Sequence, residues 1–364
     1  MDNPFVFSGI VTGKKFCNRA GEQDDLINYI NASQNVLLFS NRRTGKTSLL
    51  HQVFSRLGKD IGRMYVDLYG TVTEQDFILS VMKNIGQLES RIDRLIKITR
   101  EIFTSANISL SVDPVTGLPS LSPVFTAKSK NLMLDNVMAL LDTYSKKKKT
   151  VVVLDEFQEI ENYSKGDFEK KLRSIIQHHN NISYIFAGSK QHILDRMFHS
   201  TGRAFYRLAE SYPLPEIDEI SYLKWIRGNF GSKNTIPDST ILDIITICEK
   251  HPMYIQQFCY HLWEKKPGSG DVINEILSLI ISRNENEFMS LWDNLTSNQR
   301  KALKLIAANR GVDLYSAGSL SSVGFTSPSQ VTKSIEALMT KEIISKNGKY
   351  VIQDVMFKQW LLRL

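Results

Sequence analysis

The first 215 residues alternate short apolar runs with longer stretches in which apolar positions recur at helical spacing. The apolar runs are bounded by polar residues, as in strands buried on both faces, and they cover residues 34–40, 63–68, 150–154 and 182–187. The stretches between them predict helices over residues 46–57, 73–84, 131–145 and 167–178. This alternation predicts an α/β domain in which a parallel sheet carries helices on both faces.

Residues 106–125 interrupt this alternation. Two segments of alternating apolar and polar residues flank a turn-forming stretch, Asp113-Pro114-Val115-Thr116-Gly117-Leu118-Pro119. This arrangement predicts a β-hairpin insertion within the first domain.

The pattern changes after Pro215, where strand signals give way to helical ones. Helical periodicity covers residues 216–230, 237–249, 253–263 and 271–293. Beyond residue 295, three more helical segments (297–309, 317–323 and 329–341) precede two short strands, 343–345 and 350–352, around the turn dipeptide Asn347-Gly348. Three helices followed by a two-stranded wing is the order of a winged-helix domain. We therefore predict domains over residues 1–215, 216–294 and 295–364.

The most specific motif lies between the first predicted strand and the helix after it. Residues 40–50 read Ser-Asn-Arg-Arg-Thr-Gly-Lys-Thr-Ser-Leu-Leu, and this strand–loop–helix context is the one that a phosphate-binding loop requires. The loop amides and the helix N-terminus can surround a triphosphate, Lys46 can reach its β- and γ-phosphates, and the Thr47 hydroxyl can bind Mg²⁺. Ser40 replaces the usual first glycine, and we expect it to strain the turn slightly. The candidate nucleotide-binding residues are Asn41, Arg42, Arg43, Thr44, Gly45, Lys46, Thr47 and Ser48.

The predicted strand at residues 150–154 ends in two carboxylates, Asp155 and Glu156. We expect Asp155 to take part in the Mg²⁺ shell and Glu156 to polarise an attacking water as the general base. The chain has no Asn-Lys-x-Asp guanine-recognition motif, so adenine is the expected base. The predicted cofactors are therefore ATP and Mg²⁺.

Four further residues have either a catalytic or a structural interpretation. Ser189 follows the strand at residues 182–187 and can sense the γ-phosphate or cap the next helix. Asp67 can lie beside the Mg²⁺ shell or cap its own loop. Arg203 and Arg207 can sense the γ-phosphate or lie at the surface, since a guanidinium suits the charge that develops in phosphoryl transfer.

Five segments together form a recognisable combination: Phe16-Cys17-Asn18-Arg19-x-x-Glu22, Asn41-Arg42-Arg43-Thr44-Gly45-Lys46-Thr47-Ser48-Leu49, Leu154-Asp155-Glu156-Phe157-Gln158, Ala187-Gly188-Ser189 and His251-Pro252-Met253-Tyr254. With this combination the chain resembles the prokaryotic archaeal-type ATPase family, part of the STAND group of AAA+-related P-loop ATPases. The resemblance covers nearly the whole chain. It implies a P-loop ATPase core over residues 1–215, a helical lid over 216–294 and a winged helix over 295–364.

The resemblance also implies roles for individual residues. Phe16 and Arg19 would lie against the adenine. His251 and Pro252 would begin a lid helix that closes over the base and ribose. The family segment before the lid favours Arg207 over Arg203 as the catalytic arginine.

Two residues depart from the family pattern. Ser40 stands in place of a glycine, and Lys250 stands where a glycine often precedes the His-Pro pair. Neither departure removes a catalytic group, and both bear on nucleotide affinity.

Composition and charge limit the class of protein, its compartment and its partners. Of the 364 residues, 42% are hydrophobic and 23% charged, which is ordinary for a globular chain, and no run approaches the ~20 apolar residues of a membrane helix. The N-terminus lacks the regions of a signal peptide, and the cysteines Cys17, Cys248 and Cys259 are widely spaced. We therefore expect a reducing cytoplasm and no membrane partner. The net charge of +7 favours polyanionic partners only weakly, because the charges are interspersed.

Two basic regions are candidate nucleic-acid contacts. The four lysines at residues 146–149 precede a predicted buried strand, where a solvated loop is the simpler interpretation. The helix at residues 329–341 offers a more suitable surface, although Glu336 interrupts it. We expect that helix to bury Val331, Ile335, Leu338 and Met339, and to expose Gln330, Lys333, Ser334 and Lys341 beside the wing residues Lys346 and Lys349.

These observations favour an ATP-dependent molecular switch. The lid and winged helix would change arrangement with the bound nucleotide, a protein partner of unknown identity would read that state, and slow or partner-stimulated hydrolysis would reset it. The alternative is a DNA-handling AAA+-like ATPase, of initiator, loader or transposition type, that binds DNA through the winged helix. A scaffold without turnover agrees less well with a glutamate beside Asp155. The oligomeric state is left open.

Overall fold

The computed structural model describes residues 2–88, 108–112, 119–123, 130–163, 166–231, 236–265 and 271–364. The chain divides into two compact units. The sheet unit consists of Arg19–Asn41 and Gly45–Pro215, and the helical unit consists of Met1–Asn18, Arg42–Thr44 and Glu216–Leu364.

The sheet unit contains a five-stranded sheet in the order β2-β5-β6-β1-β7, and all of its pairings are parallel. Its strands are β1 (Val36–Phe39), β2 (Gly62–Asp67), β5 (Thr150–Asp155), β6 (Ile182–Gly188) and β7 (Glu210–Pro213). Every residue of β5 and β6 is buried, which explains their continuous apolar runs. The prediction of a parallel sheet is therefore confirmed. The edge strand β7 has no apolar run and was not predicted from the sequence. It is a strand because it pairs with β1.

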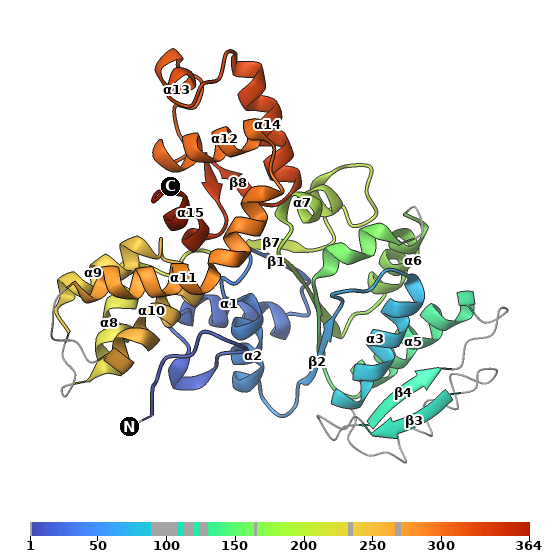
Figure 1. The fold of residues 1–364 in the computed structure, drawn as a ribbon. Coiled ribbons are helices and arrows are strands. Elements are labelled where there is room, and N and C mark those ends of the chain that lie inside the picture. Colours follow the sequence, from blue (N-terminus) through green and yellow to red (C-terminus); the bar gives the residue numbers. More distant parts are fainter. Residues whose placement is uncertain are drawn as a thin grey trace. The chain divides into compact units, whose positions relative to one another are not determined.

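Helices cover both faces of this sheet, as predicted. Figure 1 shows α1 and α2 on one side of the strands and α3, α5 and α6 on the other. The helices and 3₁₀ turns of the unit are α1 (Ala20–Asn31), α2 (Lys46–Arg56), α3 (Glu74–Asn84), η2 (Ile85–Gln87), α5 (Lys130–Ser145), η3 (Phe157–Asn162), α6 (Asp167–Ile176) and α7 (Gln191–His199).

A group of phenylalanines fixes the chain just after β5. The Phe157 ring lies 4.6 Å from Phe186 and 5.2 Å from Phe205, centroid to centroid. Both Phe157 and Phe186 are fully buried. Burial of these rings anchors η3 against β6, and it thereby holds the two carboxylates at the end of β5 in place.

The predicted hairpin insertion is present. Strand β3 (Ile108–Val112) pairs with β4 (Pro119–Pro123) in an antiparallel two-stranded sheet. The predicted turn between them lies outside the described residues.

The helical unit begins with the four predicted helices α8 (Glu219–Phe230), α9 (Asp238–Ile247), α10 (Pro252–Lys265) and α11 (Val272–Asp293). The N-terminal segment, with η1 (Gly13–Lys15), packs against them. Phe5 is 1% exposed, and its ring centroid lies 5.0 Å from Phe230 and 5.4 Å from Trp225. The sequence predicts this segment as part of the ATPase core over residues 1–215, whereas the packing of Phe5 groups it with the helical unit.

The predicted winged helix is also present. It comprises α12 (Ser297–Ala308), α13 (Ala317–Ser322), α14 (Pro328–Thr340), β8 (Ile344–Asn347) and β9 (Lys349–Ile352). The expected two-residue turn is tighter than predicted: Asn347 pairs with Lys349, and Gly348 alone turns the chain, at φ 68°. Glycine adopts this left-handed conformation without a Cβ penalty.

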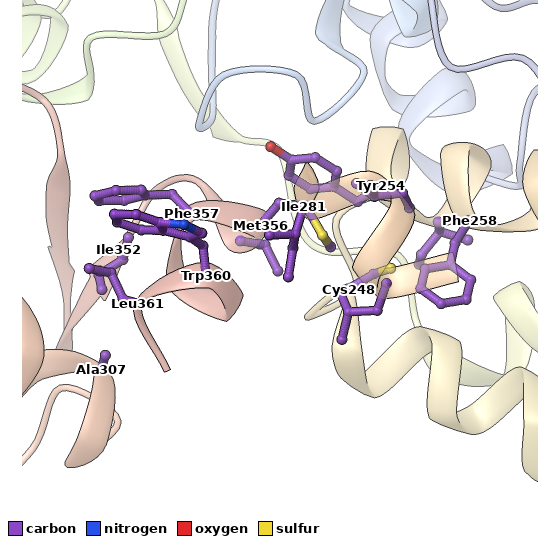
Figure 2. Close-up of a cluster of buried hydrophobic side chains, with 14 of the residues drawn as sticks. Cys248, Tyr254, Phe258, Ile281, Ala307, Ile352, Met356, Phe357, Trp360 and Leu361 are labelled. Carbon is purple, nitrogen blue, oxygen red and sulfur yellow. The ribbon is translucent and has the colours of Figure 1, made fainter. Parts of the chain in front are cut away.

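A further helix, α15 (Val355–Leu361), ends the fold and was not predicted from the sequence. Figure 2 shows Met356, Phe357, Trp360 and Leu361 of α15 within a cluster of buried apolar side chains of the helical unit. The Phe357 ring lies 5.6 Å from Phe288 of α11. Asp354 caps this helix by accepting from the Phe357 amide at 2.9 Å, but seven residues are too few for a clear periodic pattern, and packing on α11 stabilises the helix. In the described part of the chain, no helix combines the length and the hydrophobicity needed to cross a bilayer.

Candidate active site

The phosphate loop leads from β1 to α2, and its lysine opens the helix. Lys46 is 6% exposed, and its Nζ donates to the Ser40 carbonyl at 3.0 Å and to the Asn41 carbonyl at 3.1 Å. A buried ammonium group is costly unless oxygen atoms surround it, so these bonds hold the amine inside the loop. The contact of Lys46 with phosphates stays a prediction.

Ser40 fits the loop without backbone strain. The residues of the loop with positive φ are Arg43 at 60° and Gly45 at 94°, and Ser40 is not among them. Its buried hydroxyl lies 3.3 Å from Lys46 Nζ and accepts a hydrogen bond from it. The strain predicted for serine at this position is therefore wrong, because the left-handed turn falls later in the loop.

Arg42–Thr44 belong to the helical unit, and so do the predicted lid residues. The Arg42 guanidinium pairs with Glu342 at 3.0 Å, and the Arg42 carbonyl lies 3.2 Å from His251 Nε2. Burial lowers the pKa of His251, which keeps the imidazole neutral with its Nε2–H directed at that carbonyl. Pro252 opens α10, and Lys250 has φ 58°, which explains why a glycine suits that place.

The predicted metal residues, Thr47 and Asp155, lie side by side. Thr47 Oγ1 donates to Asp155 Oδ2 at 3.1 Å, and the Glu156 amide donates to Oδ1 at 2.9 Å. The carboxyl ends of parallel strands meet at one edge of the sheet, which is why two residues 108 positions apart touch. A hydroxyl and a carboxylate are the hard oxygen donors that Mg²⁺ prefers. Two protein oxygens would leave the other ligand positions of Mg²⁺ to phosphates and water, as is usual for this cation.

Glu156 is held by two neighbouring side chains. It has φ 51°, and its carboxylate accepts hydrogen bonds from Gln158 Nε2 and, at 3.1 Å, from the Ser189 hydroxyl. Ser189 follows β6, the strand next to β5, so the sheet brings the two predicted catalytic residues together. The observed partner of the Ser189 hydroxyl is thus the candidate base.

Gln158 and Gly188 belong to this arrangement, although the sequence did not single them out as site residues. Gln158 is 2% exposed, and a Cβ placed on Gly188 would lie 2.1 Å from its Oε1. Only glycine at 188 leaves room for the Gln158 amide. The two residues lie in the motifs Leu154–Gln158 and Ala187–Ser189, which the sequence analysis did single out. Their contact could not be predicted, because it depends on the pairing of β5 with β6.

Tyr65 and Asp67 of β2 extend the acidic edge of the sheet. The Tyr65 hydroxyl donates to Asp155, and burial raises the pKa of Tyr65, so the phenol remains a proton donor. Asp67 lies opposite Asp155 in the strand register, and its Oδ1 accepts from the Tyr69 amide at 2.9 Å. Partial burial raises the pKa of Asp67, and the charges of Asp155 and Glu156 add to this. Of the two interpretations for Asp67, the structure shows the loop cap.

The two candidate arginines have different surroundings. Arg203 pairs with Glu161 at 2.9 Å and with the buried Glu169 at 2.6 Å, which is a structural ion-pair network. Arg207 is exposed, and its guanidinium lies 5.1 Å from the centre of the Tyr206 ring. A catalytic role for Arg207 stays a prediction.

The residues expected to contact adenine fall in different units. Arg19 belongs to the sheet unit, is 3% exposed, and donates to the Pro215 carbonyl at 2.8 Å and to Glu22 at 3.0 Å. Phe16 belongs to the helical unit and is half-buried. Their contact with the base stays a prediction.

Comparison with known families agrees with this arrangement. Residues 30–197 match a family model described as "AAA domain", and residues 286–363 match one described as "Probable winged helix domain". The chain has an AAA-type P-loop ATPase fold followed by a winged helix domain. The AAA match contains the phosphate loop, Asp155, Glu156 and Ser189, whereas Arg207 and His251 lie outside it.

Two solved structures share this AAA and winged-helix fold over nearly the whole chain. A Walker-type ATPase of Pyrococcus abyssi has a TM-score of 0.69 at 16% identity, over 99% of this chain and 100% of its own. The ORC2 protein of Aeropyrum pernix, solved in ADPNP–ADP complexes, has a TM-score of 0.60 at 15% identity, over 98% of this chain and 95% of its own. No curated protein sequence matches the chain. The predicted fold class is confirmed, and membership of the STAND group stays a prediction.

Proposed function

We propose that this protein is a Mg²⁺-dependent ATPase that works as a nucleotide-dependent switch of the STAND type. The observation that carries the proposal is the contact of Thr47 with Asp155 at 3.1 Å, directly beside Glu156. A phosphate loop, a cation-binding pair and a base then lie at one edge of the sheet. The ATPase of Pyrococcus abyssi and the nucleotide complexes of the ORC2 protein support nucleotide binding by the shared fold.

The residues divide the work of hydrolysis among them. The loop amides and Lys46 would bind the phosphates, and Thr47 with Asp155 would hold Mg²⁺, which neutralises charge on the β- and γ-phosphates when bound. Glu156 would accept the proton of the attacking water. Its carboxylate accepts hydrogen bonds from Gln158 and Ser189, which orient it and still leave lone pairs for a water. Turnover would be slow or stimulated by a partner.

A second contact supports the switch. Arg42 lies in the phosphate loop and pairs with Glu342, just after α14, and the two side chains are 60% and 23% exposed. Ion pairs this exposed contribute about 0–1 kcal/mol, so a triphosphate can compete for the Arg42 guanidinium. Release of Glu342 would then transmit the nucleotide state to the winged helix, where a protein partner would detect it.

Replacement of Asp155 tests the cation-binding pair. Asp155→Asn is expected to weaken nucleotide binding in Mg²⁺ by about 10–100-fold and to slow turnover, because the amide has no charge for the cation shell. Binding in EDTA should change little. Calorimetric titration with ATP, in Mg²⁺ and in EDTA, measures both. The control is Asp167→Asn, since Asp167 is 86% exposed and lies 3.6 Å from Lys170; an equal loss in both variants would contradict the assignment.

DNA binding is the second candidate function, and the surface of the winged helix favours it. Lys333 of α14 is exposed, and so are Lys346 and Lys349 of the wing. Lys341 is exposed as predicted, and it donates to the Asn294 carbonyl. Ser334, in contrast, is 5% exposed and donates to the Gln330 carbonyl. The prediction that α14 exposes Ser334 is wrong, because its hydroxyl satisfies the helix backbone and turns inward.

Lys333 and Lys349 provide the test of DNA binding. If DNA binds here, Lys333→Gln with Lys349→Gln should weaken binding to duplexes of any sequence and reduce the salt slope by about two. Fluorescence anisotropy measures both quantities. Lys59→Gln with Lys170→Gln, two exposed lysines of the sheet unit, is the matched control. A wild type that binds no duplex at about 50 mM salt would remove this candidate.

A further inference from the structure

The hydroxyl of Tyr65 is directed at Asp155, one of the two residues of the candidate cation site. It lies on β2 opposite Val153 of β5, and side chains alternate along a strand, so Tyr65 and Asp155 share one face of the sheet. The Tyr65 hydroxyl donates to Asp155 Oδ2, the same oxygen that accepts from Thr47 Oγ1. The phenol therefore meets both groups that would hold the cation.

The backbone around Tyr65 is fixed although β2 is the edge strand of the sheet. The side chain of Gln87 closes that edge: its Oε1 accepts from the Tyr65 amide at 2.7 Å, and its Nε2 donates to the Tyr65 carbonyl at 3.2 Å. The ring of His51 lies 5.0 Å from the Tyr65 ring, at an interplanar angle of 35°. Because Gln87 fixes the backbone of Tyr65 and the His51 ring packs against its ring, the Tyr65 hydroxyl is held in one position.

Asp155 needs such a partner because it is only 5% exposed. Its Oδ1 is fixed by the Glu156 amide, and its Oδ2 takes both Thr47 and Tyr65. Thr47 would ligate the cation through a lone pair of Oγ1 while it donates to Asp155, whereas the Tyr65 hydroxyl would act on Asp155 alone. Tyr65 is thus the donor that serves the carboxylate only.

We propose that Tyr65 is a positioning residue for the divalent cation, because it fixes the Asp155 carboxylate in the orientation that faces Thr47. This inference rests on the proposed function, in which Thr47 and Asp155 hold Mg²⁺. On this proposal Tyr65, a residue of the edge strand, contributes to cation affinity in addition to Thr47 and Asp155. Partners of metal-binding carboxylates commonly influence metal affinity about 10–100-fold.

The test is Tyr65→Phe, which removes one oxygen atom and keeps the ring. Titration with a fluorescent ADP analogue, in Mg²⁺ and in EDTA, separates cation-dependent from cation-independent affinity. We expect affinity in Mg²⁺ to fall about tenfold and affinity in EDTA to change less than about twofold. In an Asp155→Asn background, Tyr65→Phe should have little further effect, because the two residues act through one contact.

Tyr163→Phe is the matched control. Its hydroxyl bonds to Thr71 at 2.5 Å in the same unit, and the variant should leave both affinities unchanged. A Tyr65→Phe variant with unchanged or tighter binding in Mg²⁺, or with an equal loss in EDTA, would overturn the proposal. A wild type that binds the analogue no better in Mg²⁺ than in EDTA would instead overturn the proposed function on which it rests.

Discussion

Glu156→Gln is expected to lower the single-turnover rate of ATP hydrolysis by about 10²–10⁴-fold while ATP stays bound. The amide keeps the size of the side chain and its hydrogen-bonding shape, but it does not accept a proton at neutral pH. Its carbonyl oxygen can still accept from Ser189, which lies 3.1 Å from the carboxylate. The variant should therefore fold normally and retain ATP after gel filtration, whereas the wild type releases ADP.

Glu159→Gln is the control for this experiment. Glu159 lies in the same 3₁₀ turn, and its carboxylate pairs with Lys190 at 3.5 Å. The same chemical change at that position should alter the rate by less than about twofold, since it removes only a long, partly buried ion pair and no group that the proposed chemistry uses. If Glu156→Gln hydrolysed ATP at the wild-type rate, Glu156 would not be the base and Glu159 would be the next candidate.

Lys46→Ala is expected to weaken ATP binding by well over tenfold. A charge-assisted hydrogen bond to a buried partner is worth about 1.5–3 kcal/mol, and the lysine would also balance the charge of the phosphates. Equilibrium titration with ATP measures the loss. Thermal melting checks the fold, because the variant leaves the carbonyls of Ser40 and Asn41 without their donor.

Lys59→Ala provides the comparison for Lys46→Ala. Lys59 is exposed, lies shortly after α2, and should leave ATP affinity unchanged. Undiminished affinity in Lys46→Ala, with the fold intact, would remove the phosphate-loop assignment.

Much of the sheet unit could be predicted because its signals are local. Strands β5 and β6 are buried along their whole length, so their apolar runs are continuous, and the phosphate loop has its motif within eleven residues. The meeting of Thr47 with Asp155 follows from one general property, the common edge at which parallel strands end. The placement of Ser189 beside Glu156 follows from the same property, because β6 lies next to β5.

The features that escaped prediction depend on contacts between distant segments. Strand β7 has no apolar run and forms through pairing with β1, and α15 forms through packing on α11. Phe5 joins the helical unit because its ring packs against Trp225 and Phe230, more than 200 residues away in the sequence. Tyr65 resembles any half-buried strand tyrosine until the register with β5 directs its hydroxyl at Asp155.

The central claim is that Thr47 and Asp155 form the cation site of a nucleotide bound by the phosphate loop. A crystal structure of the protein with Mn²⁺ and a non-hydrolysable ATP analogue tests it most directly, since Mn²⁺ replaces Mg²⁺ at oxygen sites and is located by anomalous scattering. The account predicts one Mn²⁺ peak about 2.1–2.2 Å from Thr47 Oγ1, with Asp155 in its shell, Lys46 on the phosphates, and a water between Glu156 and the γ-phosphate. A nucleotide bound elsewhere, or a Mn²⁺ peak that Thr47 and Asp155 do not approach, would contradict it.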